Sequence, residues 1–119
     1  MKLPSVAKAI VDRAKIVDYL LSPTHVVGRH KAAWFREAGY SDENWQELAG
    51  AIKEHARSHA ITKEEPSPFG RRFVVEGIMQ VPDGRRVLVR TVWFIRHQES
   101  TPRFVTAYPL KQRITREPK

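Results

Sequence analysis

The sequence contains no cysteine, and this absence excludes disulfide bonds, thiol catalysis and zinc sites built from cysteine ligands. Its apolar runs are only a few residues long, so the sequence predicts no membrane-spanning helix and no membrane partner. The segment after Met1 has mixed charge and no apolar core, which predicts no secretory signal and favours a cytoplasmic location. The motifs of zinc proteases, nucleotide-binding loops and serine hydrolases are also missing.

The 119 residues, of which 41% are hydrophobic and 29% charged, suit one compact domain. We expect this domain to span residues 1–109, and we expect the basic residues 110–119 to form a disordered tail.

The net charge is +8, and residues 61–119 carry twelve Lys and Arg against six Asp and Glu. Such an excess favours RNA or another polyanion, or an acidic protein, as the partner.

Helical periodicity dominates the first half of the chain. Apolar residues at helical spacing predict a helix over residues 12–21, which ends at Ser22–Pro23. A second helix is expected over residues 29–38, closed by Gly39. A third helix should begin after Ser41 and present an apolar stripe that includes Trp45, Leu48, Ala49, Ile52 and Ala56.

The period changes to two after His59, and this change predicts strands over residues 72–81, 86–96 and 103–108, with an edge strand within 60–65. Val81–Gly84 has the composition of a hairpin turn. Helices followed by strands predict an α+β fold, with N-terminal helices packed on one face of a roughly four-stranded antiparallel sheet. We expect the stripe of the third helix to contact the sheet face that carries Phe73, Val75 and Met79.

Two histidines, His55 and His59, lie four residues apart on the third predicted helix. They share a helix face, but the sequence offers no third ligand at a suitable spacing. We therefore interpret them as solvated residues near the end of the helix, where a positive charge is favourable. The sequence predicts no metal and no other cofactor.

A basic group of residues begins the second predicted helix, where Arg29, His30 and Lys31 follow Gly28. A glycine-led helix start presents free backbone N–H groups, which suit a phosphate. The two cations would add positive charge, and His30 can exchange a proton near neutral pH. The alternative is that all three are ordinary surface residues.

Polar side chains also interrupt two apolar strands, at Arg90, Thr91, Thr106 and Tyr108. A sheet face that bears hydroxyl groups and an arginine, opposite a helix that bears His30 and Lys31, would form an anion-binding cleft. The alternative is that the threonines only favour strand structure and that the tyrosine has a partner in the core.

The run from Leu20 to Phe35, together with Gly39–Tyr40, Trp45, Thr91–Trp93 and Thr106–Pro109, resembles a small uncharacterised bacterial toxin-like domain family. Members of this family occur as stand-alone proteins or as C-terminal domains of polymorphic toxins. The family is related to the barnase–EndoU–colicin–RelE-like nuclease superfamily, in which N-terminal helices precede a four-stranded antiparallel sheet. The resemblance implies a metal-independent ribonuclease toxin, with RNA as substrate and a small acidic antitoxin or immunity protein as partner.

On this hypothesis RNA is cleaved by attack of a 2′-hydroxyl group on the adjacent phosphate. The expected catalytic residues are His30 as general base or acid, Lys31 and Arg90 as phosphate ligands, and Thr106 and Tyr108 as substrate or proton-relay groups. The expected substrate-binding residues are His25, Arg29, Thr91 and Trp93, of which Trp93 would either stack on a base or lie in the core. The second proton-transfer group stays open among Tyr108, Lys31 and His25.

Two other classes of function remain open from the sequence. The chain would be a non-catalytic nucleic-acid-binding module if its cations only neutralise phosphates. It would be an interaction protein if its basic surface serves only an acidic partner. A histidine between two cations favours the endoribonuclease, because a pure binder does not need a proton-transfer group.

Overall fold

The computed structural model describes residues 1–24 and 29–110, and for Arg29 and His30 it describes the backbone alone. Of the predicted tail, residues 110–119, only Leu110 is described, and its backbone N–H donates to the carbonyl oxygen of Leu88 at 2.8 Å. The rest of the predicted tail lies outside the described residues. The elements in chain order are η1 (Val6–Lys8), α1 (Arg13–Lys15), η2 (Ile16–Leu20), α2 (Arg29–Glu37), η3 (Asp42–Asn44), α3 (Trp45–Ser58), β1 (Ile61–Ser67), β2 (Gly70–Gln80), β3 (Arg86–Arg96) and β4 (Arg103–Pro109). None of the described helices is both long and apolar enough to cross a membrane.

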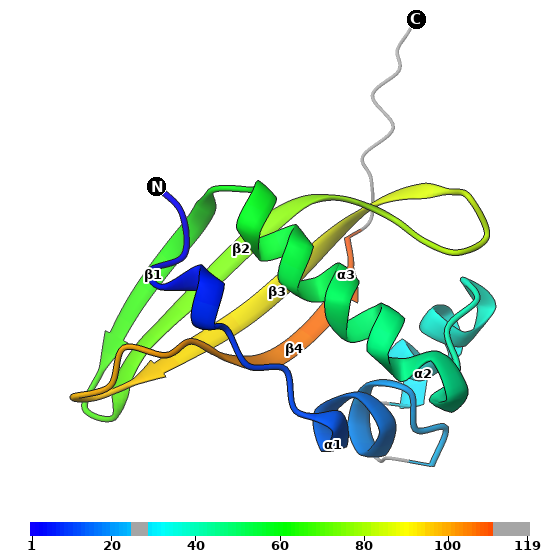
Figure 1. Cartoon of the computed structure of the whole chain (residues 1–119), viewed down its shortest axis with the longest axis horizontal. Helices are drawn as coiled ribbons and strands as arrows, with labels where there is room; N and C mark the ends of the chain where they lie inside the picture. The colour runs from blue at the N-terminus through cyan, green and yellow to red at the C-terminus, as the bar shows by residue number, and fades with distance from the viewer. Residues whose placement is uncertain (25–28, 111–119) are drawn as a thin grey trace, which may run out of the picture.

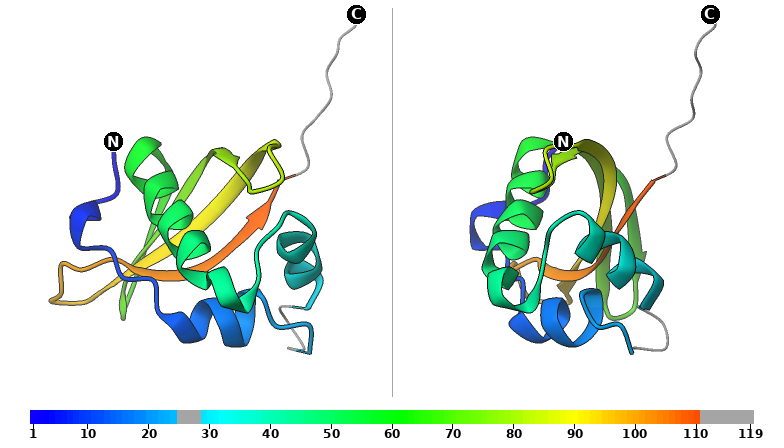
Figure 2. Two further views of the ribbon diagram at one scale, coloured as in Figure 1. Left: turned by 45° about the vertical axis from the view of Figure 1, so that its right-hand side comes forward. Right: turned by 90° about the vertical axis from the view of Figure 1, so that its right-hand side faces the viewer.

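The four strands form one antiparallel sheet in the order β1-β2-β3-β4, and α3 crosses one of its faces (Figure 1). α1, η2 and α2 lie beside the end of α3 that comes first in the chain, whereas η1 lies toward its other end (Figure 1). This arrangement confirms the predicted α+β fold, with helices on one face of a four-stranded sheet. Seen from the side, α3 and the sheet form two layers (Figure 2).

The first predicted helix is not a regular α-helix. Only Arg13–Lys15 is α-helical, and Ile16–Leu20 forms a π-helical turn. The backbone N–H of Leu21 donates to the carbonyl oxygen of Ile16 at 2.7 Å, which is the wider hydrogen bond of a π-turn. This turn buries Ile16, Leu20 and Leu21 completely, while Tyr19 stays half-buried at the surface.

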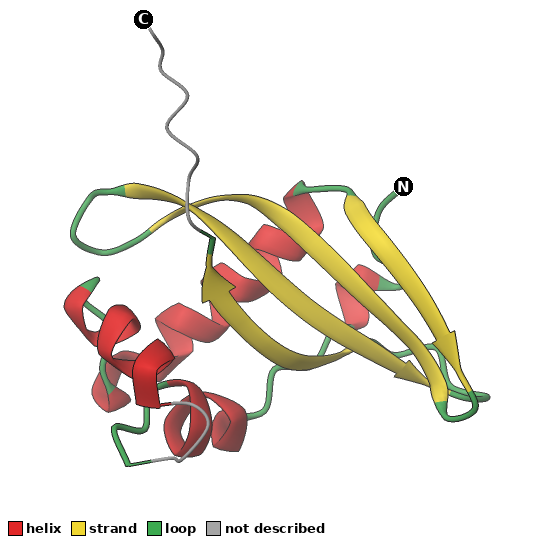
Figure 3. Cartoon of the chain, turned by 180° about the vertical axis from the view of Figure 1, so that it is seen from behind, coloured by secondary structure: helices red, strands yellow, loops and turns green. Residues whose placement is uncertain are grey.

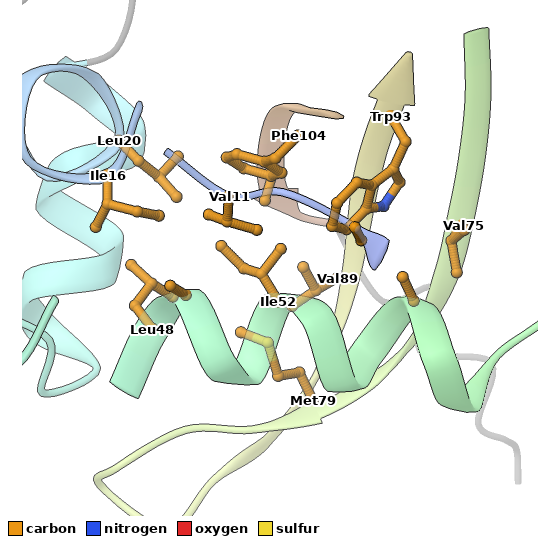
Figure 4. Packing of buried hydrophobic residues seen from close by; sticks show 14 of the residues in the cluster. Val11, Ile16, Leu20, Leu48, Ile52, Val75, Met79, Val89, Trp93 and Phe104 are labelled. Carbon is orange, nitrogen blue, oxygen red and sulfur yellow. The ribbon is translucent and has the colours of Figure 1, made fainter. Parts of the chain in front are cut away.

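The core lies between α3 and the inner face of the sheet, as predicted. Leu48 and Ile52 of α3 pack in one buried cluster with Phe73, Val75 and Met79 of β2. Figure 4 shows Ile52 and Leu48 pointing from α3 toward Trp93, Val11 and Ile16 in the same cluster. Trp45 lies partly buried against this cluster, which completes the predicted stripe.

The hairpin turn between β2 and β3 sets the register of the sheet. The N–H of Gly84 donates to the carbonyl oxygen of Val81 at 2.9 Å, and Gly84 has φ 94°, a conformation that favours glycine. The pairing then runs without interruption from Gln80 opposite Arg86 to Gly70 opposite Arg96. Side chains of β3 therefore alternate strictly between the two faces of the sheet.

His55 is buried, which contradicts the expectation of a solvated residue. Its Nε2 lies 2.9 Å from the carbonyl oxygen of Val89 and 3.1 Å from that of Gly77. Carbonyl oxygens only accept, so Nε2 carries the ring proton and Nδ1 accepts from the Thr91 hydroxyl at 3.1 Å. The indole Nε1–H of Trp93 donates in turn to Thr91 Oγ1 at 3.0 Å. These contacts hold His55 between α3 and the sheet and suit its neutral ring.

This network predicts that stability falls as the pH decreases through the ordinary pKa of histidine. Burial lowers the pKa of His55, and the nearby charge of His59 lowers it further, against the opposite effect of the Gly77 and Val89 carbonyls. Below pH ~6.5 His55 binds a proton in the unfolded chain but not in the folded chain, so the free energy of unfolding decreases. We expect a lower melting temperature at pH 5.5 than at pH 7.5.

The substitution His55→Gln keeps a donor for the carbonyls but removes the titration. Its melting temperature should change less between these two pH values than that of the wild type, whatever its absolute stability. Each unit of difference between the folded and unfolded pKa corresponds to ~1.4 kcal/mol. The protonation of His55 in the folded wild type can be followed by NMR. A ring that becomes protonated near pH 6.5 would contradict the lowered pKa.

Candidate functional site

Among the described residues, six polar side chains meet on the outer face of the sheet, where η2 and α2 lie against β4. We call this group the Lys31–Arg90 cluster, and its members are Tyr19 of η2, Lys31 of α2, Glu76 of β2, Arg90 of β3, and Thr106 and Tyr108 of β4. All six are partly buried. Among the described elements, no helix crosses the outer face of β2 and β3, whereas η2 and α2 border this face at β4 (Figure 3).

Strand register places the sheet members of the cluster side by side. Arg90 is directly opposite Glu76 on one neighbouring strand and Tyr108 on the other. Thr106 is opposite Val92, two residues further along β3. Directly opposed residues share a face of the sheet, so these side chains all project away from α3.

Lys31 joins the helical region to β4. Its Nζ donates to the hydroxyl of Tyr19 at 2.8 Å and to Oγ1 of Thr106 at 3.1 Å. The same ammonium lies 5.3 Å from the ring centroid of Tyr19 and 5.2 Å from that of Tyr108, within the range of cation–π attraction. Within residues 1–24 and 29–110, no carboxylate lies within ion-pair distance of Lys31. Its positive charge is therefore held in place without being neutralised.

Arg90 is held differently, by a carboxylate. Its Nε donates to Glu76 Oε2 at 2.7 Å, Nη2 lies 2.5 Å from the same oxygen, and Nη1 donates to the Tyr108 hydroxyl at 3.0 Å. The hydrogen bonds that Arg90 donates to Tyr108 and Glu76 raise the pKa of Arg90 above its ordinary value, so the guanidinium stays charged. Glu76 orients Arg90 and neutralises part of its charge.

The hydroxyl of Tyr19 is acidified by its surroundings. Burial by itself would raise the pKa of this phenol, but hydrogen bonds to Lys31 and Thr106 and the charges of Lys31 and Lys15 lower it below its ordinary value. The ammonium of Lys15 lies 5.6 Å from the Tyr19 ring centroid. The cluster therefore favours negative charge at this hydroxyl, as it would favour a bound anion.

A polar hollow of about 340 Å³ adjoins the cluster on the outer face. It is lined by Thr62, Lys63, Arg72, Val74, Glu76 and Arg90. Lys63 and Arg72 both pair with Glu65, at 3.1 and 2.9 Å. The strand register places two further arginines on this face. Arg86 is opposite Gln80, and Arg103 is opposite Phe94. Cations thus outnumber carboxylates along the outer face, which suits a polyanion.

Of the residues predicted to be catalytic, the structure brings Lys31, Arg90, Thr106 and Tyr108 together in the cluster. His30 precedes Lys31 in α2, but its side chain, like that of Arg29, lies outside the described residues, as does the whole of His25. The assigned roles of all of these residues remain predictions.

Thr91 and Trp93 lie elsewhere in the fold. Both are fully buried on the inner face of the sheet, where they form the hydrogen-bond network with His55. They are core residues in this structure rather than members of the cluster with Arg90, because adjacent positions of a strand face opposite sides of the sheet. For Trp93 this matches the core alternative.

Two members of the cluster were missed from the sequence, Tyr19 and Glu76. Glu76 could have been found, because the turn at Val81–Gly84 predicts the pairing that places it opposite Arg90. Tyr19 carried no such signal. Its orientation depends on the π-turn, which the helical pattern of residues 12–21 does not reveal.

The fold resembles that of a known structure. A chain of the contact-dependent growth inhibition toxin–immunity protein complex from Klebsiella pneumoniae 342 superposes with a TM-score of 0.70, over 90% of this chain and 97% of that chain. Sequence identity is 18%, so this likeness concerns the α+β architecture. No curated protein shows significant sequence similarity to the chain.

Membership of a family follows from the sequence itself. The model of the family described as "Domain of unknown function (DUF6883)" matches residues 2–111. This match covers nearly all of the described domain, and the protein therefore belongs to that family.

The basic outer face predicts salt-dependent binding of a single-stranded oligonucleotide. Removing two cations with Lys63→Ala/Arg72→Ala should weaken binding and reduce the slope of log affinity against log salt by roughly 1.4, if each contacts one phosphate. The matched control is Lys53→Ala/Arg57→Ala, which removes the same charge from exposed positions of α3. Equal losses for the two double variants would contradict a binding role for the outer face.

Proposed function

We propose that this protein is a metal-independent ribonuclease toxin, which cleaves RNA by attack of a 2′-hydroxyl group on the adjacent phosphate. The observation that carries the proposal is the environment of Lys31. This ammonium is fixed by two hydroxyl groups and lies between two aromatic rings, with no carboxylate partner in the described part of the chain. A phosphate group in the cluster would supply the missing negative charge.

The reaction needs a base, an acid and charge stabilisation around one phosphorus atom. The base removes the 2′-hydroxyl proton, the P–O2′ bond forms, the P–O5′ bond breaks, and the acid protonates the leaving oxygen. Lys31 and Arg90 would stabilise the charge that develops on the non-bridging oxygens. Arg90 keeps its planar guanidinium oriented by Glu76, which suits contact with two oxygens. His30, adjacent to Lys31 in the chain, would exchange one of the protons.

The likeness in fold to a chain of a toxin–immunity protein complex supports the toxin part of the proposal. A toxin that cleaves RNA must be neutralised in the cell that makes it. The basic outer face would attract a small acidic immunity protein or antitoxin, and binding there would cover the Lys31–Arg90 cluster. The reaction would take place in the cytoplasm, where its RNA substrate is found.

The second candidate is a non-catalytic nucleic-acid-binding module, and the hollow lined by Lys63, Arg72 and Arg90 is what favours it. A basic groove of this kind is sufficient for binding. The cluster contains more than a binder requires, because Tyr19 and Tyr108 add hydroxyl groups beside the two cations. We therefore favour the enzyme.

The purified chain, free of any partner protein, should cleave total RNA in the presence of EDTA. His30→Ala should lower the rate by ~10²–10⁴-fold with nearly unchanged RNA affinity, because loss of a proton-transfer group affects the chemical step. Arg90→Ala should weaken both affinity and rate, because its charge acts on the bound substrate and on the transition state. Gel analysis of the products and binding to an uncleavable 2′-deoxy oligonucleotide measure the two effects.

The control is Arg57→Ala, which removes an arginine that pairs with Glu54 on the exposed side of α3. It should cleave RNA at the wild-type rate. A wild-type chain that binds RNA but leaves it intact would replace the enzyme with the binding module. Undiminished cleavage by His30→Ala would remove His30 from the mechanism.

A further inference from the structure

We propose that Tyr19 is the general base of the ribonuclease, and that its phenolate oxygen, held by Lys31 and Thr106, removes the proton of the attacking 2′-hydroxyl group. This inference rests on the function proposed above and assigns a residue that the sequence did not single out. The cluster supports it in three ways, through the local backbone, the hydrogen-bond partners and the surrounding charges.

The backbone of η2 delivers Tyr19 to the cluster. Ile16 and Leu20 of the same turn are fully buried and anchor it in the core. The π-helical hydrogen bond from Leu21 to Ile16 widens the turn between these anchors. π-turns have a poorer geometry than α-helix and are frequent at functional sites. Here the widened turn sets the phenol against Thr106, 87 residues further along the chain.

The partners of the Tyr19 hydroxyl suit both of its protonation states. The protonated phenol accepts from Lys31 at 2.8 Å and donates to Thr106 Oγ1 at 3.0 Å. After loss of the proton, the Thr106 hydroxyl can rotate and donate to the phenolate, while Lys31 continues to donate. The proton can therefore leave and return while the hydrogen bonds to Lys31 and Thr106 are both kept, as a general base requires.

Charge separates Tyr19 from the other two tyrosines. Two lysines, Lys31 and Lys15, lie beside its ring, and their charges together with its hydrogen bonds outweigh the effect of burial and lower the pKa of its hydroxyl. Tyr40 is the opposite case, because burial and the charge of Glu47 raise its pKa to about 12. Lys31 also lies 5.2 Å from the ring centroid of Tyr108. The hydroxyl of Tyr108, however, accepts its hydrogen bond from Arg90, whose charge Glu76 neutralises in part.

The step balances within the groups available. The Tyr19 phenolate takes the proton of the 2′-hydroxyl group, and the freed oxygen forms the P–O2′ bond. The P–O5′ bond breaks, and the leaving oxygen takes a proton from the general acid, for which the chain offers His30 and Tyr108. Lys31 contacts the base, so it would stabilise the phenolate before the step and the phosphorus oxygens of a phosphate bound beside it during the step. Solvent then restores the two protonation states.

The first test is Tyr19→Phe, which keeps the ring beside Lys31 and removes only the hydroxyl group. We expect the cleavage rate to fall by ~10²–10⁴-fold, with affinity for a 2′-deoxy oligonucleotide nearly unchanged. Tyr40→Phe is the matched control, because it removes a hydroxyl group from a buried ring that packs against Phe35. This control should cleave at close to the wild-type rate.

A second test shows whether the Tyr19 hydroxyl transfers a proton or only holds Lys31 in position. Site-specific incorporation of fluorotyrosine at position 19 makes the hydroxyl more acidic while its hydrogen bonds remain. The rise of kcat/KM with pH should then move to lower pH, and by the same amount as the pKa of Tyr19 measured by NMR. In a chain that carries Lys31→Met, the pKa of Tyr19 should rise, because the adjacent charge is gone.

The outcomes distinguish this inference from the proposed function. If Tyr19→Phe cleaves RNA at the same rate as the wild type, the role of Tyr19 is refuted but the proposed ribonuclease function is not. Slow cleavage by Tyr19→Phe without a shift of the pH profile in the fluorotyrosine protein would make Tyr19 a positioning residue, which also overturns the inference. A wild type without any cleavage would instead refute the proposed function. If Tyr19→Phe does not fold, the fluorotyrosine protein decides.

Discussion

The hydrogen bonds that link Trp93 to Thr91 and Thr91 to His55 determine how β3 presents its two faces. They tie the central strand to α3 through groups that are fully buried or nearly so, and a buried polar group that lost its partner would cost ~1–3 kcal/mol. With Thr91 and Trp93 committed to the core, the alternation of the strand turns Arg90 outward. The pairing of β3 with its neighbours then brings Glu76 and Tyr108 to that arginine. The outer-face cluster thus depends on the inner-face network.

The other half of the cluster comes from the helical region. Tyr19 and Lys31 reach β4 because the fully buried residues of η2 and α2, among them Leu20 and Phe35, anchor these elements in the core. A partly buried ammonium without a carboxylate is costly, since its loss of water is not repaid by an ion pair. The hydroxyl groups and rings around Lys31 offset part of that cost. Such an arrangement favours an anion, and the same surroundings lower the pKa of the Tyr19 hydroxyl.

Much of the fold followed from the sequence, because the change from helical to alternating periodicity near His59 is a strong signal and the Val81–Gly84 turn sets the main hairpin. The face of the sheet contacted by Ile52 could be predicted for the same reason. Less could be predicted of the site. Alternation places Arg90 and Thr91 on opposite faces of the sheet, so the prediction that put both in one cleft was wrong on that rule alone. Alternation does not say which face is buried when both faces carry apolar residues. The π-turn at Tyr19 and the burial of His55 depend on tertiary contacts that no local pattern encodes.

The chemistry of the cut ends tests the account most directly. Attack by a neighbouring 2′-hydroxyl group leaves a 2′,3′-cyclic phosphate on one fragment and a 5′-hydroxyl group on the other, and it needs no metal ion. The measurement is mass spectrometry of the fragments of a short RNA cleaved by the purified chain in EDTA, beside the same RNA with a single 2′-deoxy nucleotide at the cleaved position. We predict cyclic phosphate ends from the first RNA and no cleavage at that position in the second. Fragments with 3′-hydroxyl and 5′-phosphate ends, or cleavage of the 2′-deoxy RNA, would contradict the account.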